Sequence, residues 1–496
     1  MLQDRFGVWR CGDYELSLAR PRVMGILNVT PDSFSDGGSH VGKDQAVEHA
    51  LRMLDEGADI IDVGGESRRP GFAAVSAEEE AQRVVPVVAD LVAQGVIVSV
   101  DTRNAELARV CLRLGASIIN DVTGFSSPEM VELAASSGCG CVIMHAGKVP
   151  GHAARRSVQL DGPALGTHTD KVPASDRLQE LMDNAAKNMP SPSSSRRPTT
   201  TPEAAPILRQ VMGFLGDQAR TLMRAGVDRE RLCVDPGAGF GKFADEDVVI
   251  QRATAKLASM GYPLMCAVSR KRVVGATTAV SQPQDRDAGS IGMALAALQA
   301  GARVFRVHDV AGTAQALNTY WAMVNPVARK AYISLGSNVG ERMSYLSRAR
   351  ALIDAIPLTC VTGTSHVYET EPAYGIRDAV ANCVVEIKTE LAPLVLLDAL
   401  MDVETQLGRT RDWRSSIPGP RTIDCDLVWM EDEIHTGRKL KLPHPGFGER
   451  DYVLRPLADL MRDPERFFTH AGIELVPAEE RVGKVVKDLG ELHDAE

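Results

Sequence analysis

Eight short, β-rich apolar runs constrain the fold of the first two-thirds of this chain more than any other feature. They cover residues 23–29, 59–65, 96–102, 117–122, 141–146, 232–237, 264–270 and 303–310. Segments with helical periodicity lie between them, such as 44–56, 77–94 and 291–300. Every interval between successive runs except one has the length of a βα unit, and eight such units close into a barrel. The spacing therefore predicts an α/β fold with a (β/α)8 TIM barrel over residues 1–326.

The exceptional interval separates the fifth run from the sixth and predicts an insertion. It contains KNMPSPSSSRRPTTTPEAAP at 187–206, which is too rich in Ser, Thr and Pro to form a core. We interpret residues 147–206 as an inserted, partly disordered segment in the loop after the fifth strand.

A different pattern begins near residue 331 and predicts a second domain, residues 331–496. Strands are expected at 331–335, 359–369, 382–390 and 422–430, and helices at 341–355 and 393–407. This βαββαβ order is typical of an α+β, ferredoxin-like domain.

Composition excludes several classes of protein for this chain of 496 residues. The formal net charge of −10 counts against a general nucleic-acid or anionic-membrane binder. The nine cysteines include no CxxC pair and are expected to be small buried hydrophobes in a reducing compartment. There is no apolar leader segment and no apolar run of about 18 residues, so a cytoplasmic location without membrane partners is expected.

Polar residues follow each of the eight predicted strands. A single Asp in this position is more often a helix cap than a catalyst, but eight consecutive strands ending this way indicate a site at the C-terminal face of the barrel. Carboxylates and amides there suit an N–H-rich heterocycle, and the cations suit an anion. The residues are Asn28, Glu66, Asp101, Asn120, Asp121, His145, Asp235, Ser269, Arg270, Lys271, Arg306, His308 and Asp309.

The motifs around these positions resemble dihydropteroate synthase, in family order through about residues 20–325. They are MGILNVTPDSFSDGG (24–38), VGGES (63–67), DT (101–102), IND (119–121), DPGAGFGK (235–242), SRK (269–271) and RVHDV (306–310). The resemblance implies condensation of 6-hydroxymethyl-7,8-dihydropterin diphosphate with 4-aminobenzoate, giving 7,8-dihydropteroate and diphosphate.

The resemblance also implies roles for individual residues. Asp101, Asn120, Asp235 and Lys271 would line the pterin pocket, while Asn28, Arg306 and His308 would hold the diphosphate, with Asn28 also reaching Mg²⁺. Ser269 would meet the aminobenzoate carboxylate, with Phe240 and Lys271 near its ring. Mobile loops carrying Asp36 and Arg69 would close over the site. Lys271, Asp101, Arg306 and His308 are the catalytic candidates.

Three positions depart from the family pattern in the barrel. Arg68 stands where the family has Thr or Ser, Ala146 where it has a Met near the pterin, and Ser290 where it has Thr. The first two motivate an alternative in which the barrel binds pterin with little or no turnover. A second alternative, a barrel that acts on a folate methyl group, is disfavoured by the loop motif NVTPDSFSDGG.

In the second domain, TIDCDL (422–427) places Asp424 and Asp426 on one face of a predicted strand, a pattern that suits Mg²⁺ with a polyphosphate. A surface salt-bridge pair would be the ordinary explanation of so short a motif. Together with GSN (336–338), ETEP (369–372), GRTR (408–411), GPRTIDCD (419–426) and LPHP (442–445), it resembles hydroxymethyldihydropterin pyrophosphokinase. That family transfers diphosphate from ATP to 6-hydroxymethyl-7,8-dihydropterin and releases AMP.

This second resemblance implies that Asp424 and Asp426 hold Mg²⁺ and that Asn382 and Tyr452 contact the pterin. The ATP site would comprise Glu404, Arg409, Arg411, Arg421 and His444, with Arg409 and Arg421 also catalytic. Val380 stands where a second pterin-stacking aromatic is expected, and Pro418 replaces a usual Trp, with Trp413 nearby. A higher KM for the pterin is expected.

The two resemblances together predict a bifunctional transferase of folate biosynthesis in which the C-terminal domain makes the substrate of the barrel. The substrates are hydroxymethyldihydropterin, ATP and 4-aminobenzoate, the cofactor is Mg²⁺, and the resemblance implies a homodimer formed through the barrel. Linkage alone does not establish that the intermediate passes directly between the sites.

Overall fold

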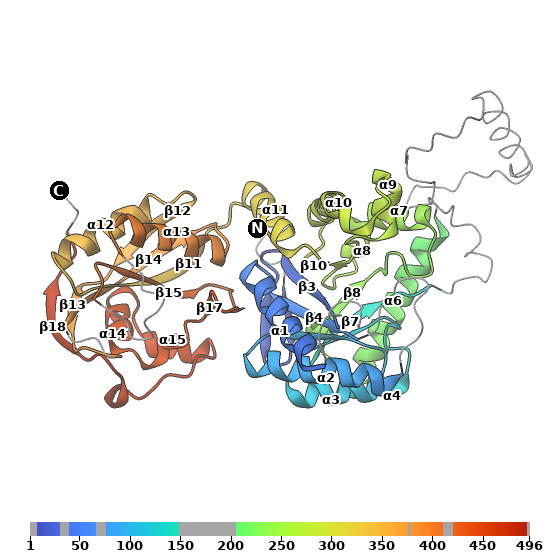
Figure 1. The fold of residues 1–496 in the computed structure, drawn as a ribbon, viewed down its shortest axis with the longest axis horizontal. Coiled ribbons are helices and arrows are strands. Elements are labelled where there is room, and N and C mark those ends of the chain that lie inside the picture. Colours follow the sequence, from blue (N-terminus) through green and yellow to red (C-terminus); the bar gives the residue numbers. More distant parts are fainter. Residues whose placement is uncertain are drawn as a thin grey trace, which may run out of the picture.

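The computed structural model describes residues 7–29, 39–65, 76–147, 205–374, 378–409 and 420–493. Figure 1 shows two units side by side, a barrel coloured blue to yellow and a C-terminal unit coloured orange to red. None of the helices in these ranges is long and apolar enough to cross a membrane.

The first unit is a barrel of eight parallel strands, as the spacing predicts. The strands are β3 (Arg22–Asn28), β4 (Ile60–Gly64), β5 (Val98–Asp101), β6 (Ile118–Asp121), β7 (Gly140–Met144), β8 (Leu232–Asp235), β9 (Met265–Cys266) and β10 (Val304–Val307). Their hydrogen-bonded order is β8-β7-β6-β5-β4-β3-β10-β9. A parallel bridge between Val234 and Leu264 joins the two ends and closes the barrel.

Helices follow the strands and cover the outside of the barrel. They are α1 (Ser39–Asp55), α2 (Ala77–Ala93), α3 (Ala105–Leu114), α4 (Pro128–Ser136), α6 (Pro206–Arg224), α7 (Ala244–Arg252), α8 (Thr254–Ala258), α9 (Arg272–Thr278), α10 (Asp287–Gln299) and α11 (Val310–Val324). Local sequence fixes their ends: the Ser76 hydroxyl accepts from Glu79 N at 3.2 Å, and Gly115 ends α3 with φ +109°. Most of the predicted insertion, residues 148–204, lies outside the described residues.

An N-terminal hairpin that the sequence did not predict closes the other end of the barrel. It consists of β1 (Val8–Cys11) and β2 (Tyr14–Ser17). Trp9 is fully buried against barrel residues such as Met24 and Ile60, and its indole N–H donates to Arg231 O at 3.1 Å. Short, half-polar strands of four residues give little periodicity, which is why sequence patterning missed them.

The second unit contains an antiparallel sheet in the order expected of a ferredoxin-like domain. Its strands are β11 (Arg329–Ser337), β12 (Thr359–Thr364), β13 (Val367–Thr370), β14 (Val380–Thr389), β15 (Asp424–Met430) and β18 (Val485–Gly490). The order is β15-β11-β14-β13-β18, with β12 also pairing with β14. The single strand expected over 359–369 is therefore two strands. They separate at Ser365, whose hydroxyl accepts from Val384 N at 2.9 Å.

Helices bury both faces of this sheet. On one face, α12 (Arg342–Asp354) and α13 (Pro393–Gln406) pack against residues such as Ile333 and Val385. On the other face, α14 (Asp451–Leu460) and α15 (Pro464–His470) pack against Tyr332 and Val384. A small hairpin, β16 (His435–Thr436) and β17 (Lys441–Leu442), follows β15.

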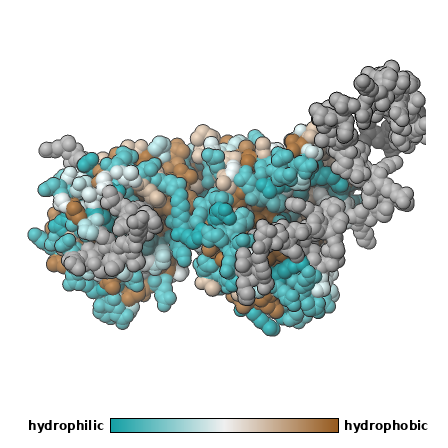
Figure 2. Space-filling model, in the orientation of Figure 1, coloured by the Kyte–Doolittle hydropathy of each residue, from teal (hydrophilic) through white to brown (hydrophobic). Residues whose placement is uncertain are grey.

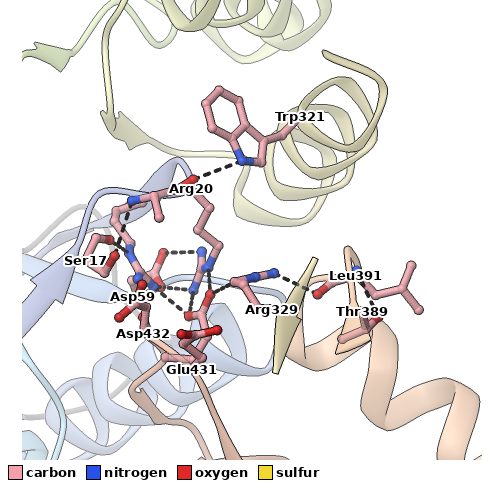
Figure 3. A network of polar contacts seen from close by, with 12 residues as sticks. Ser17, Arg20, Asp59, Trp321, Arg329, Thr389, Leu391, Glu431 and Asp432 are labelled. Atoms are coloured by element: carbon pink, nitrogen blue, oxygen red, sulfur yellow. Dashed lines mark hydrogen bonds and ion pairs between the residues drawn. The ribbon is translucent and has the colours of Figure 1, made fainter. Parts of the chain in front are cut away.

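A buried cluster of charged side chains joins the two units at the N-terminal end of the barrel strands (Figure 3). Glu433, beyond the end of β15, accepts from Arg20 Nε at 2.6 Å and from Arg22 Nη1 at 2.8 Å. It also pairs with Arg329 of β11, and Asp59 of the barrel accepts from both Arg20 and Arg22. Figure 2 shows hydrophilic surface across the boundary between the units on the face it presents. Because guanidinium groups surround these carboxylates, buried ion pairs connect the two units in addition to the covalent link between α11 and β11.

Candidate functional site

A cavity of about 380 Å³ opens at the C-terminal ends of the barrel strands. The structure brings together there every described barrel residue to which the resemblance assigns a role in binding or catalysis. These are Asn28, Asp101, Asn120, Asp235, Phe240, Ser269, Lys271, Arg306 and His308. They come from six different strands or the loops after them, so only the closed barrel makes them neighbours.

Arg306 is fixed in this cavity by two carboxylates. Its Nε donates to Asp62 Oδ2 at 2.6 Å and its Nη2 to Asp101 Oδ2 at 2.9 Å. Asn120 also donates to Asp62, at 3.2 Å. Burial works against the charge of Arg306, but the two carboxylates outweigh burial and hold its pKa above the ordinary value. The guanidinium therefore remains a fixed positive charge facing the cavity.

The segment Ser269-Arg270-Lys271 presents two side chains to the cavity from a constrained backbone. Arg270 has φ +58°, which is unusual for a residue with a Cβ. Its guanidinium pairs with Asp287 of α10 through two contacts of 2.7 Å, and its N–H donates to Ser290 Oγ at 2.9 Å. Ser290 thus keeps a hydroxyl contact at the position where the family has Thr.

Ser269 and Lys271, on either side of Arg270, have different surroundings. The Ser269 hydroxyl lies 3.0 Å from His308 Nδ1 and accepts from His308 N at 3.1 Å. Lys271 lies over the Phe240 ring, with Nζ 4.7 Å from the ring centre. Burial lowers the pKa of Lys271, while Asp235 opposes that shift.

Several polar residues near the strand ends have structural contacts instead. Asp309 caps α11 by accepting from Gly312 N at 3.1 Å, and Asp121 accepts from Thr123 N and Phe125 N at 2.8 Å each. Ala146 is exposed, while Met144 two residues earlier lines the cavity. Asp36, Glu66, Arg68 and Arg69 lie outside the described residues.

The second site lies at the beginning of β15. Asp424 and Asp426 lie on the same face of this strand, opposite Gly336 and Ser334 of β11. Burial and the neighbouring charge of Asp424 raise the pKa of Asp426 to about 6. Carboxylate oxygens are the ligands that Mg²⁺ prefers, and a divalent cation would relieve this repulsion, so the pair fits the ion.

The part of the chain that the structure describes holds no group of three or more His, Cys, Asp or Glu side chains close enough to bind a metal. Mg²⁺ commonly takes one or two protein carboxylates and completes its shell with phosphate and water oxygens. The pair Asp424 and Asp426 suits this mode of binding.

Arginines surround the two carboxylates. Arg409 pairs with Asp424 and with Glu404, and Arg421 Nη1 lies 2.7 Å from Asp424 Oδ2. Glu404 also accepts from Cys425 N at 2.8 Å, which ties α13 to β15. Of the predicted ATP site, Glu404 and Arg409 therefore contact each other, and Arg421 joins them through Asp424. Arg411 lies outside the described residues.

The predicted pterin contacts lie beside this cluster. Asn382 of β14 lies opposite Gly336 of β11, and a Cβ at Gly336 would lie 2.9 Å from Asn382 Oδ1. Glycine there leaves a recess between Asn382 and Asp424. Asn382 Nδ2 donates to Thr370 Oγ1 at 2.7 Å, which orients the amide.

Arg450 connects Tyr452 to the acidic pair. Its guanidinium lies 5.7 Å from the Tyr452 ring and 5.5 Å from the Tyr374 ring, and its Nη1 is 3.4 Å from Asp426 Oδ2. Tyr374 is thus a second aromatic residue beside this site, where Val380 of β14 supplies none. Burial and the charge of Arg450 lower the pKa of His444 to about 4, so its imidazole is neutral at pH 7.

Sequence reasoning missed Asp62, Arg450 and Tyr374. Asp62 lies inside an apolar strand, where its position directly before the VGGES motif (63–67) was the only signal. Arg450 precedes Tyr452 by two residues, and on that ground it was a detectable candidate. The Tyr374 hydroxyl donates to Glu449, which lies 75 residues further along the chain. No motif in the sequence around Tyr374 indicates this contact.

Two family models match the chain. A model described as "Pterin binding enzyme" matches residues 24–308, and one described as "7,8-dihydro-6-hydroxymethylpterin-pyrophosphokinase (HPPK)" matches residues 332–462. The first covers the barrel and its cavity, and the second covers the domain that carries Asp424 and Asp426.

Relatives of the barrel are similar over nearly their whole length. Dihydropteroate synthase of Neisseria meningitidis serogroup C is 36% identical over 64% of this chain and 97% of its own. The Escherichia coli K12 dihydropteroate synthase is 36% identical over 64% of this chain and 96% of its own. A solved dihydropteroate synthase from Xanthomonas albilineans, with 4-aminobenzoic acid, is 37% identical over 64% of this chain and 99% of its own, with a TM-score of 0.51. The chain therefore belongs to the dihydropteroate synthase family and carries a fused hydroxymethyldihydropterin pyrophosphokinase domain.

Proposed function

We propose that the chain catalyses two consecutive steps of folate biosynthesis. The C-terminal domain transfers diphosphate from ATP to 6-hydroxymethyl-7,8-dihydropterin, and the barrel condenses the product with 4-aminobenzoate to give 7,8-dihydropteroate. The observation that carries this proposal is that one chain contains both constellations, the barrel cavity and the acidic pair among arginines.

In the barrel, the amine of 4-aminobenzoate replaces diphosphate at the methylene carbon of the pterin. Negative charge builds on the leaving diphosphate, and Arg306, held by Asp62 and Asp101, is a preorganised counter-charge for it. Asn28 and His308 complete the proposed diphosphate site. Asp235 is buried, and one of its oxygens accepts from Gly237 N at 2.7 Å, which orients the carboxylate toward a planar N–H donor such as the pterin.

Lys271 and Ser269 are assigned to the aminobenzoate half of the barrel site. Ser269 is proposed to meet the carboxylate of 4-aminobenzoate, and Phe240 provides an aromatic surface for its ring. Lys271 lies over the Phe240 ring, and its ammonium also interacts electrostatically with Asp235, so we propose that it acts at both substrate sites. Asn120 is proposed to bind the pterin beside Asp101.

In the C-terminal domain, catalysis of diphosphate transfer is mainly positioning and charge stabilisation. Mg²⁺ held by Asp424 and Asp426 would supply the positive charge that neutralises the polyphosphate. Arg409, Arg421 and His444 are assigned to the ATP phosphates, and Glu404 positions Arg409. Asn382 and Tyr452 are proposed to hold the pterin so that its hydroxyl meets the β-phosphorus.

The organisation of the molecule adds finer proposals. We assign residues 1–326 to the synthase domain, with 147–206 as an insertion, and residues 331–496 to the pyrophosphokinase domain. The described elements support this division, because α11 ends at Val324 and β11 begins at Arg329. A homodimer formed through the barrel and a cytoplasmic location complete the proposal, and sedimentation velocity tests the first of these.

A barrel that binds pterin without turnover is the second candidate, motivated by Arg68 and Ala146. The cavity argues against it, because every described residue assigned to synthase chemistry lines it. Arg68→Thr distinguishes the two: a large gain in dihydropteroate formation would favour the weakly active barrel.

Variants that silence one site at a time test the proposal. With Asp424→Asn, AMP release should stop, and dihydropteroate should form only when pterin diphosphate is supplied. With Lys271→Met, AMP release should continue while dihydropteroate formation falls by about two orders of magnitude or more. Loss of both reactions in either variant, in a folded protein, would contradict the assignment of the two steps to separate domains.

A further inference from the structure

Lys242 is the last residue of the glycine-rich loop after β8. Its ammonium is buried and donates hydrogen bonds to main-chain carbonyls. Its Nζ donates to Gly237 O at 2.6 Å, His145 O at 2.9 Å and Phe240 O at 3.1 Å. The residue is only 4% exposed. An ammonium has three protons, so these three carbonyls match its full donor capacity. His145 follows β7 while the other two acceptors follow β8, so Lys242 joins two neighbouring strand ends.

The two segments approach so closely that their contact depends on glycine. A Cβ at Gly237 would lie 2.0 Å from His145 O, and one at Gly241 would lie 2.1 Å from Gly147 O. Both glycines have positive φ, +68° and +62°. Backbone carbonyls converge at this contact, and the ammonium of Lys242 offsets the repulsion between them.

The same loop carries Phe240 into the cavity. The Phe240 main chain is held by its carbonyl, which accepts from both Lys242 Nζ and Gly147 N, the latter at 3.1 Å. The neighbouring Gly239 N donates to Asp247 at 2.8 Å. The Phe240 ring then lies against Lys271, whereas Lys242 itself does not line the cavity.

We propose that Lys242 is a positioning residue of the synthase site, whose ammonium fixes Phe240 as the aromatic wall against which the ring of 4-aminobenzoate binds. This inference rests on the proposed synthase function and deepens it. Lys242 acts through the loop and not on the substrates, so its loss is expected to affect the use of 4-aminobenzoate more than that of pterin diphosphate.

The charge of Lys242 responds to pH in an accessible range. Burial lowers the pKa of Lys242 to about 8. The carboxylates of Asp247, Asp235 and Glu246 oppose this shift, and the charge of Lys271 adds to it. Two further groups face Lys242. His145 has its pKa lowered to about 4 by burial and by the charge of Lys242, and the Arg272 guanidinium donates to the main-chain carbonyl of Lys242. Above pH 8 the side chain therefore loses the charge and one of the three donors that hold the loop.

Lys242→Met is the direct test, because it keeps an unbranched side chain of similar length and removes the ammonium. We expect the KM for 4-aminobenzoate to rise roughly tenfold or more, with a smaller change in the KM for pterin diphosphate. The far-UV circular dichroism spectrum and the thermal unfolding midpoint report that the barrel of the variant is folded, and AMP release by the C-terminal domain of the same molecule is the internal activity control. Arg231→Met is the matched control: Arg231 is also buried and donates to two carbonyls, Cys139 O and Ala134 O, but at the opposite end of the barrel.

A second measurement keeps the test valid if Lys242→Met does not fold. In the unmodified enzyme, the KM for 4-aminobenzoate should rise between pH 7 and 9.5 as Lys242 loses its proton. In Phe240→Leu the KM should already be high and nearly independent of pH, because the side chain that Lys242 positions is gone. Titration of Lys271 would instead give a pH dependence that persists in Phe240→Leu.

The outcomes separate this inference from the proposed function. If the unmodified enzyme makes no dihydropteroate from pterin diphosphate, the synthase function itself is wrong. If it does, and Lys242→Met has an unchanged KM for 4-aminobenzoate or shifts both KM values equally, the positioning role is wrong. A change in KM with Arg231→Met as large as that with Lys242→Met would also overturn it.

Discussion

At the scale of single residues, the two sites use opposite arrangements of charge. In the barrel a guanidinium, Arg306, is held between Asp62 and Asp101, so the cation that we propose for the leaving diphosphate is in place before substrate binds. In the C-terminal domain two carboxylates lie on one strand face, and burial together with the charge of Asp424 raises the pKa of Asp426 to about 6. This pair is the site that we propose for Mg²⁺.

This pKa predicts how the Mg²⁺ requirement of the pyrophosphokinase depends on pH. Below pH 6 the Asp426 carboxyl is increasingly protonated and cannot bind a cation, so the Mg²⁺ concentration for half-maximal AMP release should rise roughly tenfold per pH unit. Activity assays at several Mg²⁺ concentrations between pH 5 and 8 measure this. An Mg²⁺ requirement that is the same at pH 5 and pH 7 would show that Asp426 is not a ligand.

At the scale of elements, α10 supports the segment that carries Ser269 and Lys271. Asp287, its first residue, anchors Arg270 in its left-handed conformation. Asp287→Ala should lower the synthase kcat/KM roughly tenfold through misplacement of the neighbouring side chains. AMP release should not change. Asp285→Ala, an exposed carboxylate two residues earlier, is the control, and an equal loss in that variant would contradict the role of the anchor.

The elements also show how far the sequence could predict the fold. Runs of apolar residues located all eight barrel strands, and the residues after them located the cavity, because the C-terminal ends of parallel strands meet by geometry. The hairpin β1–β2 was missed because its strands are short. Arg20, Arg22 and Glu433 gave no signal, since the contacts that join them span more than 400 residues. The position of Lys242 within a family motif was visible, but its acceptors are main-chain atoms that no side-chain pattern encodes.

At the scale of the whole molecule, the buried charge cluster sets how the two domains are joined. Burial works against the ionised form of Glu433, but Arg20, Arg22 and Arg329 outweigh burial and hold its pKa well below the ordinary value. The stabilisation that Glu433 provides is therefore present above about pH 4.5 and is lost as the pH falls.

Glu433→Gln should destabilise the protein by about 3–5 kcal/mol at pH 7, because Arg329 then loses its carboxylate partner and Arg20 and Arg22 are left to share Asp59. Urea unfolding at pH 7 and pH 4 measures this, and the difference between variant and unmodified protein should shrink at pH 4. Glu431→Gln, which alters a carboxylate that accepts from Lys330 N beside the cluster, should change stability by less than about 1 kcal/mol. Equal effects of the two variants would count against the cluster.

The same arrangement places the two sites far apart. In the barrel, β3 runs from Arg22 in the cluster to Asn28 at the cavity, and β15 runs from Asp424 at the acidic pair to Met430, just before Glu433. Each strand spans roughly 20 Å. Among the described residues, the hairpin packs into the barrel end that faces the cluster and blocks a route through the barrel interior.

Pterin diphosphate should therefore pass between the sites through solvent. In an isotope-dilution assay, unlabelled pterin diphosphate added to the full reaction should mix completely with the labelled intermediate. Retention of label in dihydropteroate above the value for full mixing would indicate a direct path that this arrangement does not provide.

One reaction tests the central claim that both domains act in sequence on one metabolite. The purified full-length protein is mixed with 6-hydroxymethyl-7,8-dihydropterin, ATP, Mg²⁺ and 4-aminobenzoate, and products are read by mass spectrometry. We expect dihydropteroate, AMP and diphosphate in equal amounts, with no dihydropteroate when ATP is omitted. AMP without dihydropteroate, even after pterin diphosphate is added directly, would contradict the claim and leave a barrel that binds pterin without turnover.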